Sequence, residues 1–300
     1  MSKEPLVSIL INCFNGEKYL KQSLESVISQ KYNNWEIIFW DNQSTDSSAK
    51  IFQGYKDRRF KYYLADNHSK FLYEARNYAL QKAKGDFIAL LDVDDWWLPD
   101  KLEKQIPLFN NSNVGLVYGN LWYQIEKKNK KKILKKSPLP TGNILEQLLN
   151  DYVIRTATIV LRKKCLDELK YKFNSHFHII GDFDLNIRLA SRWEAKCVQT
   201  PVAFVRIHGK NETILNREKE IAEFKTWHDS MKKDKIISLN KGFKKIPLKI
   251  SYLEVLQDIL SGTFGQNFLK VVKYPFGLNK IKLIFALFLP KFILKIIRDY

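Results

Sequence analysis

The first ninety residues alternate short β-rich runs with stretches of helical periodicity. The pattern predicts strands at Val7–Ile11, Glu36–Trp40, Lys61–Leu64 and Phe87–Leu91, and helices at Gly16–Gln30, with Asn15 as its cap, and near Phe71–Lys84. Because this is a repeated strand–helix order, we expect a parallel sheet with helices on both faces. Such a sheet binds ligands just beyond the carboxyl ends of its strands.

The chain is long enough for one sizeable domain and an appendage. It has 300 residues, of which 45% are hydrophobic, and this excludes a disordered chain, a collagen-like chain and a low-complexity linker. Cys13, Cys165 and Cys197 lie far apart without CxxC spacing, so neither a disulfide framework nor a thiolate zinc site is expected. The first apolar run is too short for a signal peptide. We therefore expect a cytoplasmic protein in a reducing compartment.

The pattern is less regular beyond residue 100. It predicts a helix that has Pro99 in its first turn and runs through Phe109, strands at Val114–Ile125, Thr158–Leu161 and Val202–Ile207, and a helix from about Asp182 to Arg192. Seven of the ten residues Lys127–Lys136 are lysines. We interpret this run as a solvated hairpin tip and keep a phosphate or nucleic-acid contact as the alternative, because charge blocks usually lie on loops.

The C-terminal part has a different composition. Helical patterns alone continue from about Leu215, which suggests a main domain at 1–215 and a helical extension at 216–300. The net charge of the chain is +18, and residues 216–300 hold 17 basic and 8 acidic side chains. Such a surplus favours nucleic acid, an anionic membrane surface or phosphorylated substrates.

The closing stretch Leu278–Ile297 is rich in apolar residues. Lys282, Pro290, Lys291 and Lys295 interrupt it, so it falls short of the roughly 20 apolar residues that cross a bilayer. Its basic and apolar residues separate in the manner of a helix that lies on an anionic membrane. The alternative is an amphipathic helix that packs on the main domain.

Most of the chemistry in the sequence is carried by carboxylates. Asp92, Asp94 and Asp95 follow an apolar strand, and in an extended segment Asp92 and Asp94 project to the same side. Oxygen ligands of this kind suit Mg²⁺ or Mn²⁺, although one of the acids could simply cap the following helix. Asp41 ends the second strand as Asn12 ends the first, so the sheet brings them to the same edge. No G-x-G-x-x-G and no P-loop motif is present, which argues against a dinucleotide site and a P-loop ATPase.

Five ordered blocks together resemble glycosyltransferase family 2. They are Val7–Leu20 (VSILINCFNGEKYL), Trp35–Asp46 (WEIIFWDNQSTD), Ala75–Asn77 (ARN), Leu90–Pro99 (LLDVDDWWLP) and Gly181–Ala190 (GDFDLNIRLA). The resemblance covers roughly residues 5–215. It implies a GT-A fold, which is an α/β fold with a Rossmann-like, mostly parallel sheet and helices on both faces, here followed by a basic helical extension. It also implies transfer of a sugar from a nucleotide-sugar with inversion at the anomeric carbon.

The resemblance assigns roles position by position. It implies a catalytic base at Asp182, donor-binding residues at Cys13, Phe14, Asn15, Asp41, Arg76, Asp92 and Asp95, and metal ligands at Asp94 and His208. The cofactor would be Mn²⁺ or Mg²⁺, and Asp41 would contact the nucleobase. The sequence departs from the family at Gly181, where an acid usually precedes the base, and at Tyr78, which replaces a common glycine. Trp96 and Trp97 could stack on a sugar or be buried in the core.

These observations predict an inverting, metal-dependent enzyme that acts in bacterial surface polysaccharide, lipooligosaccharide or capsule synthesis. Its expected partners are a nucleotide-sugar, which the family resemblance implies to be UDP-linked, a glycan or lipid-linked acceptor, and the inner face of the plasma membrane. Transfer to polyprenyl phosphate and a non-catalytic sugar-binding domain are the alternatives. No nucleic-acid partner is expected, because the lysines cluster in a loop and a tail without a recognition motif.

Overall fold

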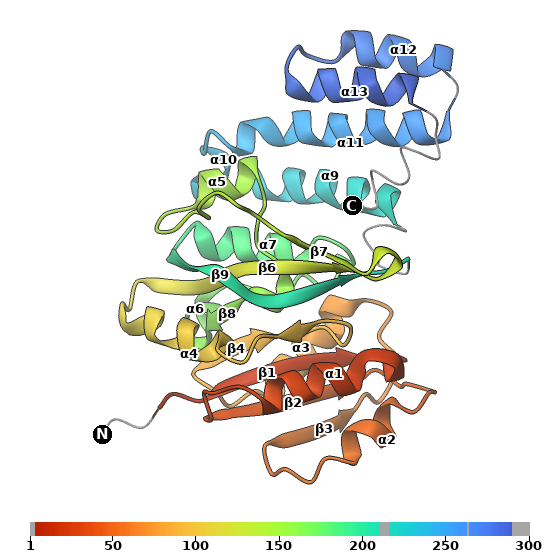
Figure 1. Cartoon of the computed structure of the whole chain (residues 1–300). Helices are drawn as coiled ribbons and strands as arrows, with labels where there is room; N and C mark the ends of the chain where they lie inside the picture. Colours follow the sequence, from red (N-terminus) through yellow and green to blue (C-terminus); the bar gives the residue numbers. More distant parts are fainter. Residues whose placement is uncertain (1–3, 210–215, 263, 290–300) are drawn as a thin grey trace. The chain divides into compact units, whose positions relative to one another are not determined.

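The computed structural model describes residues 4–209, 216–262 and 264–289. The chain divides into two compact units, Met1–His208 and Gly209–Tyr300. All strands of the described chain belong to the first unit, and the second is helical (Figure 1). The domain boundary predicted after residue 215 falls beside the segment 210–215, outside the described residues, and stays a prediction.

The N-terminal half of the first unit is a parallel sheet. Its elements are β1 (Val7–Cys13), β2 (Trp35–Asp41), β3 (Phe60–Leu64), β4 (Phe87–Leu90), α1 (Glu17–Ile28), α2 (Ser48–Gln53) and α3 (Leu72–Lys82). The four strands lie in the order β3-β2-β1-β4, and every neighbouring pair is parallel. The strand–helix alternation of the sequence therefore predicted this half of the fold correctly.

The helices cover both faces of these strands because the strands are apolar on both sides. Val7, Ile9 and Ile11 of β1 share a core with Leu20 and Leu24 of α1. Alternate side chains of β1 and β2 point to the opposite face, against which α3 packs. Figure 1 shows α1 crossing one face of these strands.

The second half of the first unit makes the sheet mixed. It contains β5 (Trp96–Trp97), β6 (Val114–Ile125), β7 (Lys130–Ile133), β8 (Val160–Arg162), β9 (Glu194–Ile207), α4 (Lys101–Gln105), α5 (Leu145–Asn150), α6 (Lys163–Glu168) and α7 (Gly181–Ala190). β8 joins β4 to β6 with antiparallel pairing on both sides, β6 and β9 are parallel, and β5 pairs antiparallel with β9. The sheet is thus mostly parallel at one end and mixed at the other.

The prediction that Asn15 caps the first helix is wrong. α1 begins at Glu17, and the Asn15 side chain accepts a hydrogen bond from the Thr45 backbone N–H at 2.8 Å. Asn15 has a positive φ of 53°, which turns the chain away from the helix. The Asp46 side chain accepts from the Glu17 N–H at 3.0 Å, so a loop distant in sequence satisfies the helix end.

The predicted position of Pro99 within a helix is also wrong. α4 begins at Lys101, and Pro99 lies outside it. The expected continuation through Phe109 is a separate 3-10 helix at Ile106–Asn110, with proline near its first position. Proline lacks the N–H that an α-helix would need there, so the regular helix ends.

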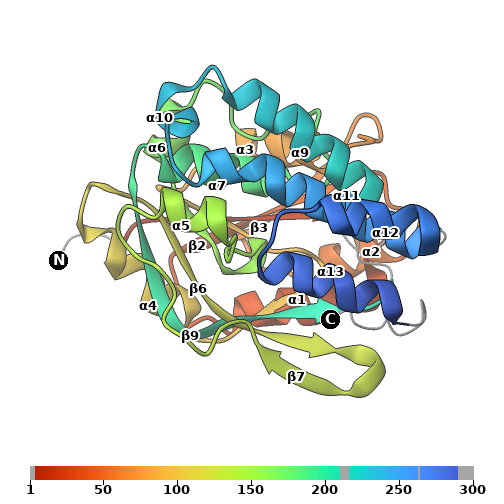
Figure 2. The same cartoon turned by 90° about the horizontal axis from the view of Figure 1, so that it is seen from above.

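The lysine-rich run forms the end of a hairpin. β7 pairs antiparallel with β6, from Trp122 opposite Ile133 to Ile125 opposite Lys130. Lys127, Lys128 and the lysines of β7 are exposed. Figure 2 shows this hairpin from above, and its exposure agrees with the interpretation as a solvated tip.

The second unit is a layered set of helices. They are α9 (Arg217–Met231), α10 (Lys235–Ser238), α11 (Ile246–Ser261), α12 (Phe264–Lys273) and α13 (Leu278–Phe288). α11 packs against α9 on one side and against α12 and α13 on the other. Phe224 and Trp227 of α9 are buried.

In the described part of the chain, no helix combines the length and apolar character needed to cross a bilayer. α13 accounts for the beginning of the predicted closing helix. The predicted basic face at Lys291, Lys295 and Arg298 lies outside the described residues.

Buried Lys101 provides a test of this fold by pH. Its ammonium group is fully buried, donates to Oε1 of Gln105 at 2.7 Å and lies 4.1 Å from the centre of the Trp97 ring. Burial lowers the pKa of Lys101 well below its usual value. Lys101 has a lowered pKa in the folded protein and its ordinary pKa in the unfolded chain. At a pH between these two values the unfolded chain binds more protons than the folded one, so the free energy of unfolding rises as the pH rises.

We expect Lys101→Met to remove this rise. Inside the window the wild type should gain up to about 1.4 kcal/mol per pH unit relative to the variant. Urea unfolding between neutral and alkaline pH measures the difference. The exposed Lys21→Met variant is the control and should follow the wild type; equal slopes for Lys101→Met and wild type would contradict the burial argument.

Candidate active site

The carboxyl ends of β1, β2 and β4 meet at one edge of the sheet. Cys13 at the end of β1 is in register with Asp41 at the end of β2. Leu10 of β1 is in register with Leu90 of β4, so Asp92 follows at the same edge. Parallel pairing thus brings together residues that are 28 to 79 positions apart in the sequence.

Asp41 is buried and held on both carboxylate oxygens. The Ser44 backbone N–H donates to Oδ1 at 2.7 Å, and the Tyr62 hydroxyl donates to Oδ2 at 2.7 Å. Burial raises the pKa of Tyr62, and the adjacent Asp41 acts in the same direction, so the phenol keeps the proton it donates. Asp41 therefore fixes the turn after β2.

The loop after β1 lies against this turn. The Asn15 N–H donates to the Ser44 hydroxyl at 3.1 Å. Cys13 is buried, and burial raises the pKa of its thiol, so the side chain stays a neutral part of the core. Phe14 is half exposed, with its ring centre 4.5 Å from that of His68. Phe14 and His68 form an aromatic surface at the sheet edge, and sequence reasoning missed His68.

Arg76 and Asp92 form an ion pair at 2.5 Å. Arg76 comes from α3 and is 2% exposed, and its buried Nη1 has no hydrogen-bond partner among the residues that the structure describes. Burial raises the pKa of Asp92, because the surrounding protein removes water from the carboxylate. Arg76 opposes this rise in pKa, and the charges of Asp94 and Asp182 add to it. The predicted donor residues Arg76 and Asp92 are thus direct neighbours.

Asp94 and His208 are also neighbours, although they are more than a hundred residues apart. Nε2 of His208 lies 3.0 Å from Oδ2 of Asp94. The hydrogen bonds between β5 and β9 bring the two strands, and with them these side chains, together. The predicted pair of metal ligands is therefore adjacent.

Asp95 turns into the protein. It is 6% exposed, and its Oδ1 accepts the Arg206 backbone N–H at 2.9 Å. Burial raises the pKa of Asp95 well above its usual value, and the charges of Asp94 and Asp92 act in the same direction. Asp95 therefore holds the acidic loop to β9.

Arg206 organises the side of the site that sequence reasoning missed. Its Nε donates to the Asp94 backbone oxygen at 2.9 Å, and its Nη1 lies 3.2 Å from Glu126. Its guanidinium lies 4.3 Å from the centre of the Tyr19 ring, which in turn stacks on His208. The sequence signal was present, since Arg206 stands two residues before His208.

The tryptophans that follow the acids are structural. Trp97 is 2% exposed. Trp96 stacks on Phe204 of β9 with ring centres 4.7 Å apart and an interplanar angle of 7°. Of the two sequence alternatives, burial in the core therefore describes Trp97, and Trp96 packs on the neighbouring strand.

Two tyrosines hold Asp182 at the start of α7. The Tyr73 hydroxyl donates to Oδ1 at 3.2 Å, and the Tyr152 hydroxyl is 3.4 Å from Oδ2. Burial raises the pKa of both phenols well above the usual value, and the charge of Asp182 acts in the same direction, so both remain donors. Asn186 donates to the Tyr152 hydroxyl at 2.8 Å. Neither tyrosine was among the predicted site residues.

Gly181 explains one departure from the family pattern. A Cβ at this position would lie 2.4 Å from the Tyr73 ring, which is much closer than two carbon atoms can approach. The Tyr73 ring therefore occupies the space beside Asp182 that a side chain at position 181 would need. Tyr78, the other noted departure, stacks on Trp40 at 5.4 Å.

Together these residues form one acidic site in the first unit. The charge of Asp182 raises the pKa of Asp92 and the pKa of Arg76. Tyr73 lies between Asp182 and Arg76, with its ring centre 5.2 Å from the Arg76 guanidinium. Among the described residues no group of three or more His, Cys, Asp and Glu side chains forms a metal cluster. The arrangement brings a tyrosine-held carboxylate (Asp182), a buried arginine (Arg76) and an adjacent aspartate–histidine pair (Asp94 and His208) into one part of the first unit.

This fold is that of a GT-A glycosyltransferase. The family model "Glycosyl transferase family 2" matches residues 8–170, more than half of the chain, and the chain belongs to that family.

The curated relatives are glycosyltransferases. The chain is 36% identical over 168 residues to the Escherichia coli UDP-Glc:alpha-D-GlcNAc-diphosphoundecaprenol beta-1,3-glucosyltransferase WfgD, covering 56% of this chain and 64% of WfgD. It is 40% identical over 106 residues to the putative teichuronic acid biosynthesis glycosyltransferase TuaG of Bacillus subtilis, covering 34% of this chain and 41% of TuaG. The chain thus spans less than two thirds of the length of either relative.

Solved structures have the same fold. S. aureus TarS superposes with a TM-score of 0.65 at 15% identity, covering 98% of this chain and 54% of TarS. Mannosyltransferase PcManGT from Pyrobaculum calidifontis, solved with GDP-Man and Mn²⁺, gives a TM-score of 0.64 at 15% identity, covering 99% of this chain and 85% of PcManGT. The predicted GT-A fold class is confirmed.

We expect Gly181→Ala to destabilise the protein by about 1–3 kcal/mol, because the buried Tyr73 ring must move. Urea unfolding measures the change. Gly209→Ala is the control, since a Cβ there meets no atom within 4 Å. In the background of Tyr73→Ala the cost of Gly181→Ala should largely disappear; an undiminished cost would show that the ring is not the obstacle.

Proposed function

We propose that the chain is an inverting, divalent-metal-dependent transferase that moves a sugar from a UDP-sugar to a lipid-linked glycan in surface polysaccharide synthesis. One observation carries the proposal: Asp182 is held by two tyrosine hydroxyls next to the Arg76–Asp92 ion pair. An inverting displacement needs a base on one side of the anomeric carbon and stabilisation of the leaving diphosphate on the other.

In the proposed reaction Asp182 accepts the proton of the acceptor hydroxyl as the new glycosidic bond forms. Tyr73 and Tyr152 orient the carboxylate and keep one lone pair of each oxygen occupied. Arg76 fixes Asp92, which faces the ribose or the donor sugar. Asp41 and the loop at Cys13, Phe14 and Asn15 form the nucleotide end of the site, and buried Asp95 supports the acidic loop.

Asp94 and His208 suit a divalent cation. Two ligand atoms at about 2.1 Å from an octahedral ion lie about 3 Å apart, which matches the 3.0 Å between Oδ2 and Nε2. A donor set of one carboxylate and one imidazole favours Mn²⁺ over Mg²⁺. When bound, the cation neutralises charge on the leaving nucleoside diphosphate.

The relatives support the choice of donor and acceptor. The name of WfgD includes UDP-Glc and a GlcNAc-diphosphoundecaprenol acceptor, and TarS has been solved with UDP and with UDP-GlcNAc. The name of WfgD favours a lipid-diphosphate-linked glycan over bare polyprenyl phosphate. Because such an acceptor is anchored in the bilayer, we place the enzyme at the cytoplasmic face of the plasma membrane.

Replacing Asp182 by Asn should lower the rate of sugar transfer at saturating donor by about 100- to 10,000-fold, because the amide cannot accept the proton. The assay offers UDP-, GDP- and TDP-sugars with Mn²⁺ and a GlcNAc-diphospholipid acceptor. Exposed Asp167→Asn is the matched control and should retain the wild-type rate. Full transfer by Asp182→Asn would contradict its role, and donor binding without turnover by the wild type would favour a non-catalytic domain.

Asp94→Ala and His208→Ala should each weaken Mn²⁺ binding by at least about tenfold. Calorimetric titration of Mn²⁺ in the presence of UDP measures this effect independently of turnover. Exposed Asp151→Ala and His176→Ala are the matched controls. Chelation of the metal should stop transfer by the wild type, and Mn²⁺ should restore it; unchanged Mn²⁺ affinity in both variants would reject the metal site.

A further inference from the structure

The outer side of α12 and α13 is an exposed apolar surface. Leu269 and Val272 of α12, Phe276 between the helices, and Leu278 and Phe285 of α13 are all at least half exposed. Phe276 reaches 89% and Leu278 reaches 78%. Isolated exposed apolar residues are ordinary, but a set of this size within one helical pair marks an interaction surface. We call these five residues the apolar face.

The apolar face is not the result of poor packing, because the inner sides of the same helices are well packed. Val271, Tyr274 and Leu283 belong to a core cluster with Val255 and Ile259 of α11. The exposed residues are therefore the side of a folded layer that points away from its own core.

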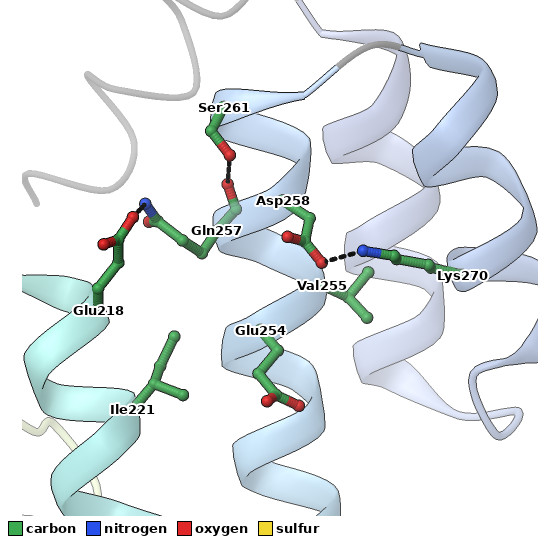
Figure 3. A pocket seen from close by; sticks show the side chains of 8 residues that line it. All are labelled: Glu218, Ile221, Glu254, Val255, Gln257, Asp258, Ser261 and Lys270. Carbon is green, nitrogen blue, oxygen red and sulfur yellow. Dashed lines mark hydrogen bonds and ion pairs between the residues drawn. The ribbon is translucent and has the colours of Figure 1, made fainter.

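Polar contacts also fix α12 on α11. Lys270 pairs with Asp258 at 2.6 Å, and the Asn267 side chain donates to the Asp258 backbone oxygen at 2.9 Å. Figure 3 shows Lys270 reaching Asp258 from the neighbouring helix, at the rim of a cavity of about 480 Å³. Two of the acids beside this cavity are engaged by lysines, since Glu254 pairs with Lys225 at 2.5 Å.

Lysines border the apolar face. At about 3.6 residues per turn, Leu278, Ile281 and Phe285 fall on one stripe of α13, and Lys280 and Lys282 fall on its two sides. The sequence from 264 to 288 contains four lysines and neither aspartate nor glutamate. An apolar stripe with basic borders has the charge and polarity of a helix at the interface of an anionic bilayer.

We infer that the α12–α13 pair docks on an anionic phospholipid bilayer, with the apolar face inserted among the lipid headgroups and its lysines next to lipid phosphates. This inference deepens the proposed location of the enzyme, and it assigns the contact to a surface other than the tail beyond residue 289. A second copy of the chain fits the apolar face less well than an anionic bilayer does. A symmetric pairing of this face would bring lysines against lysines, with no acid in the segment to meet them.

Flotation of the full-length protein with phosphatidylcholine vesicles, with and without phosphatidylglycerol, tests the inference. The wild type should float with the anionic vesicles and much less with the neutral ones. The double variant Leu278→Ser/Phe285→Ser should lose at least about tenfold in partitioning. Leu64→Ser and Leu239→Ser replace leucines that are equally exposed elsewhere, and both should float like the wild type.

Charge reversal separates this surface from the lysine hairpin. Lys280→Glu/Lys282→Glu should weaken binding to anionic vesicles by about fivefold or more per lysine, whereas Lys130→Glu/Lys132→Glu should retain it. Loss of binding in the hairpin variant alone would overturn the assignment. Wild-type protein that stays with the unbound fraction, or that sediments as a dimer converted to monomer by Leu278→Ser/Phe285→Ser, would also overturn it.

Two further measurements distinguish a loss of membrane binding from a loss of fold and from a loss of catalytic activity. Thermal unfolding by circular dichroism should be unchanged in the surface variants, so a loss of flotation is not a loss of fold. Transfer to a short-chain, water-soluble acceptor should also be unchanged. If the wild type floats, the surface variants do not, and the wild type transfers no sugar, the proposed function fails and the membrane surface stands. If the wild type transfers sugar but the surface variants float as it does, the function stands without this surface.

Discussion

The parallel pairing of β1 with β2 and β4 is the constraint on which the site depends. It brings the ends of three strands to one edge, and each end carries polar residues that would repel one another without compensation. Arg76 supplies that compensation for Asp92 from α3, and Arg206 supplies it for the loop of Asp94 and Asp95 from β9. The acids can gather because two arginines, one of them fully surrounded by protein, are fixed beside them.

Sequence periodicity predicted the parallel half of the sheet because β1, β2 and β4 are short apolar runs that are buried almost completely, and helical patterns separate the successive strands. It also predicted β6 with its observed bounds, Val114–Ile125. The two-residue strand β5 was not predicted, because its existence depends on pairing with β9 and not on local pattern. Asn15 was assigned to the wrong partner because the competing Thr45 N–H comes from thirty residues away.

The predicted site residues were found through the family resemblance, and the structure adds the side chains that hold them. Tyr73 and Tyr152 belong to no motif of short spacing, so the sequence alone does not separate them from core residues, whereas Arg206 stands two residues before the predicted ligand His208. The sequence shows that Gly181 departs from the family pattern, but it does not show why glycine stands there. The absent side chain and the Tyr73 ring are two parts of a single arrangement, which only coordinates connect.

Asp94 stands two residues before β5, and His208 directly follows β9, so the pairing of these two strands brings the two side chains together. Their separation is therefore set by backbone geometry and does not depend on the hundred or so residues that connect them along the chain. Insertions or deletions in that connecting segment can therefore change the other surfaces of the unit during evolution while Asp94 and His208 keep their spacing.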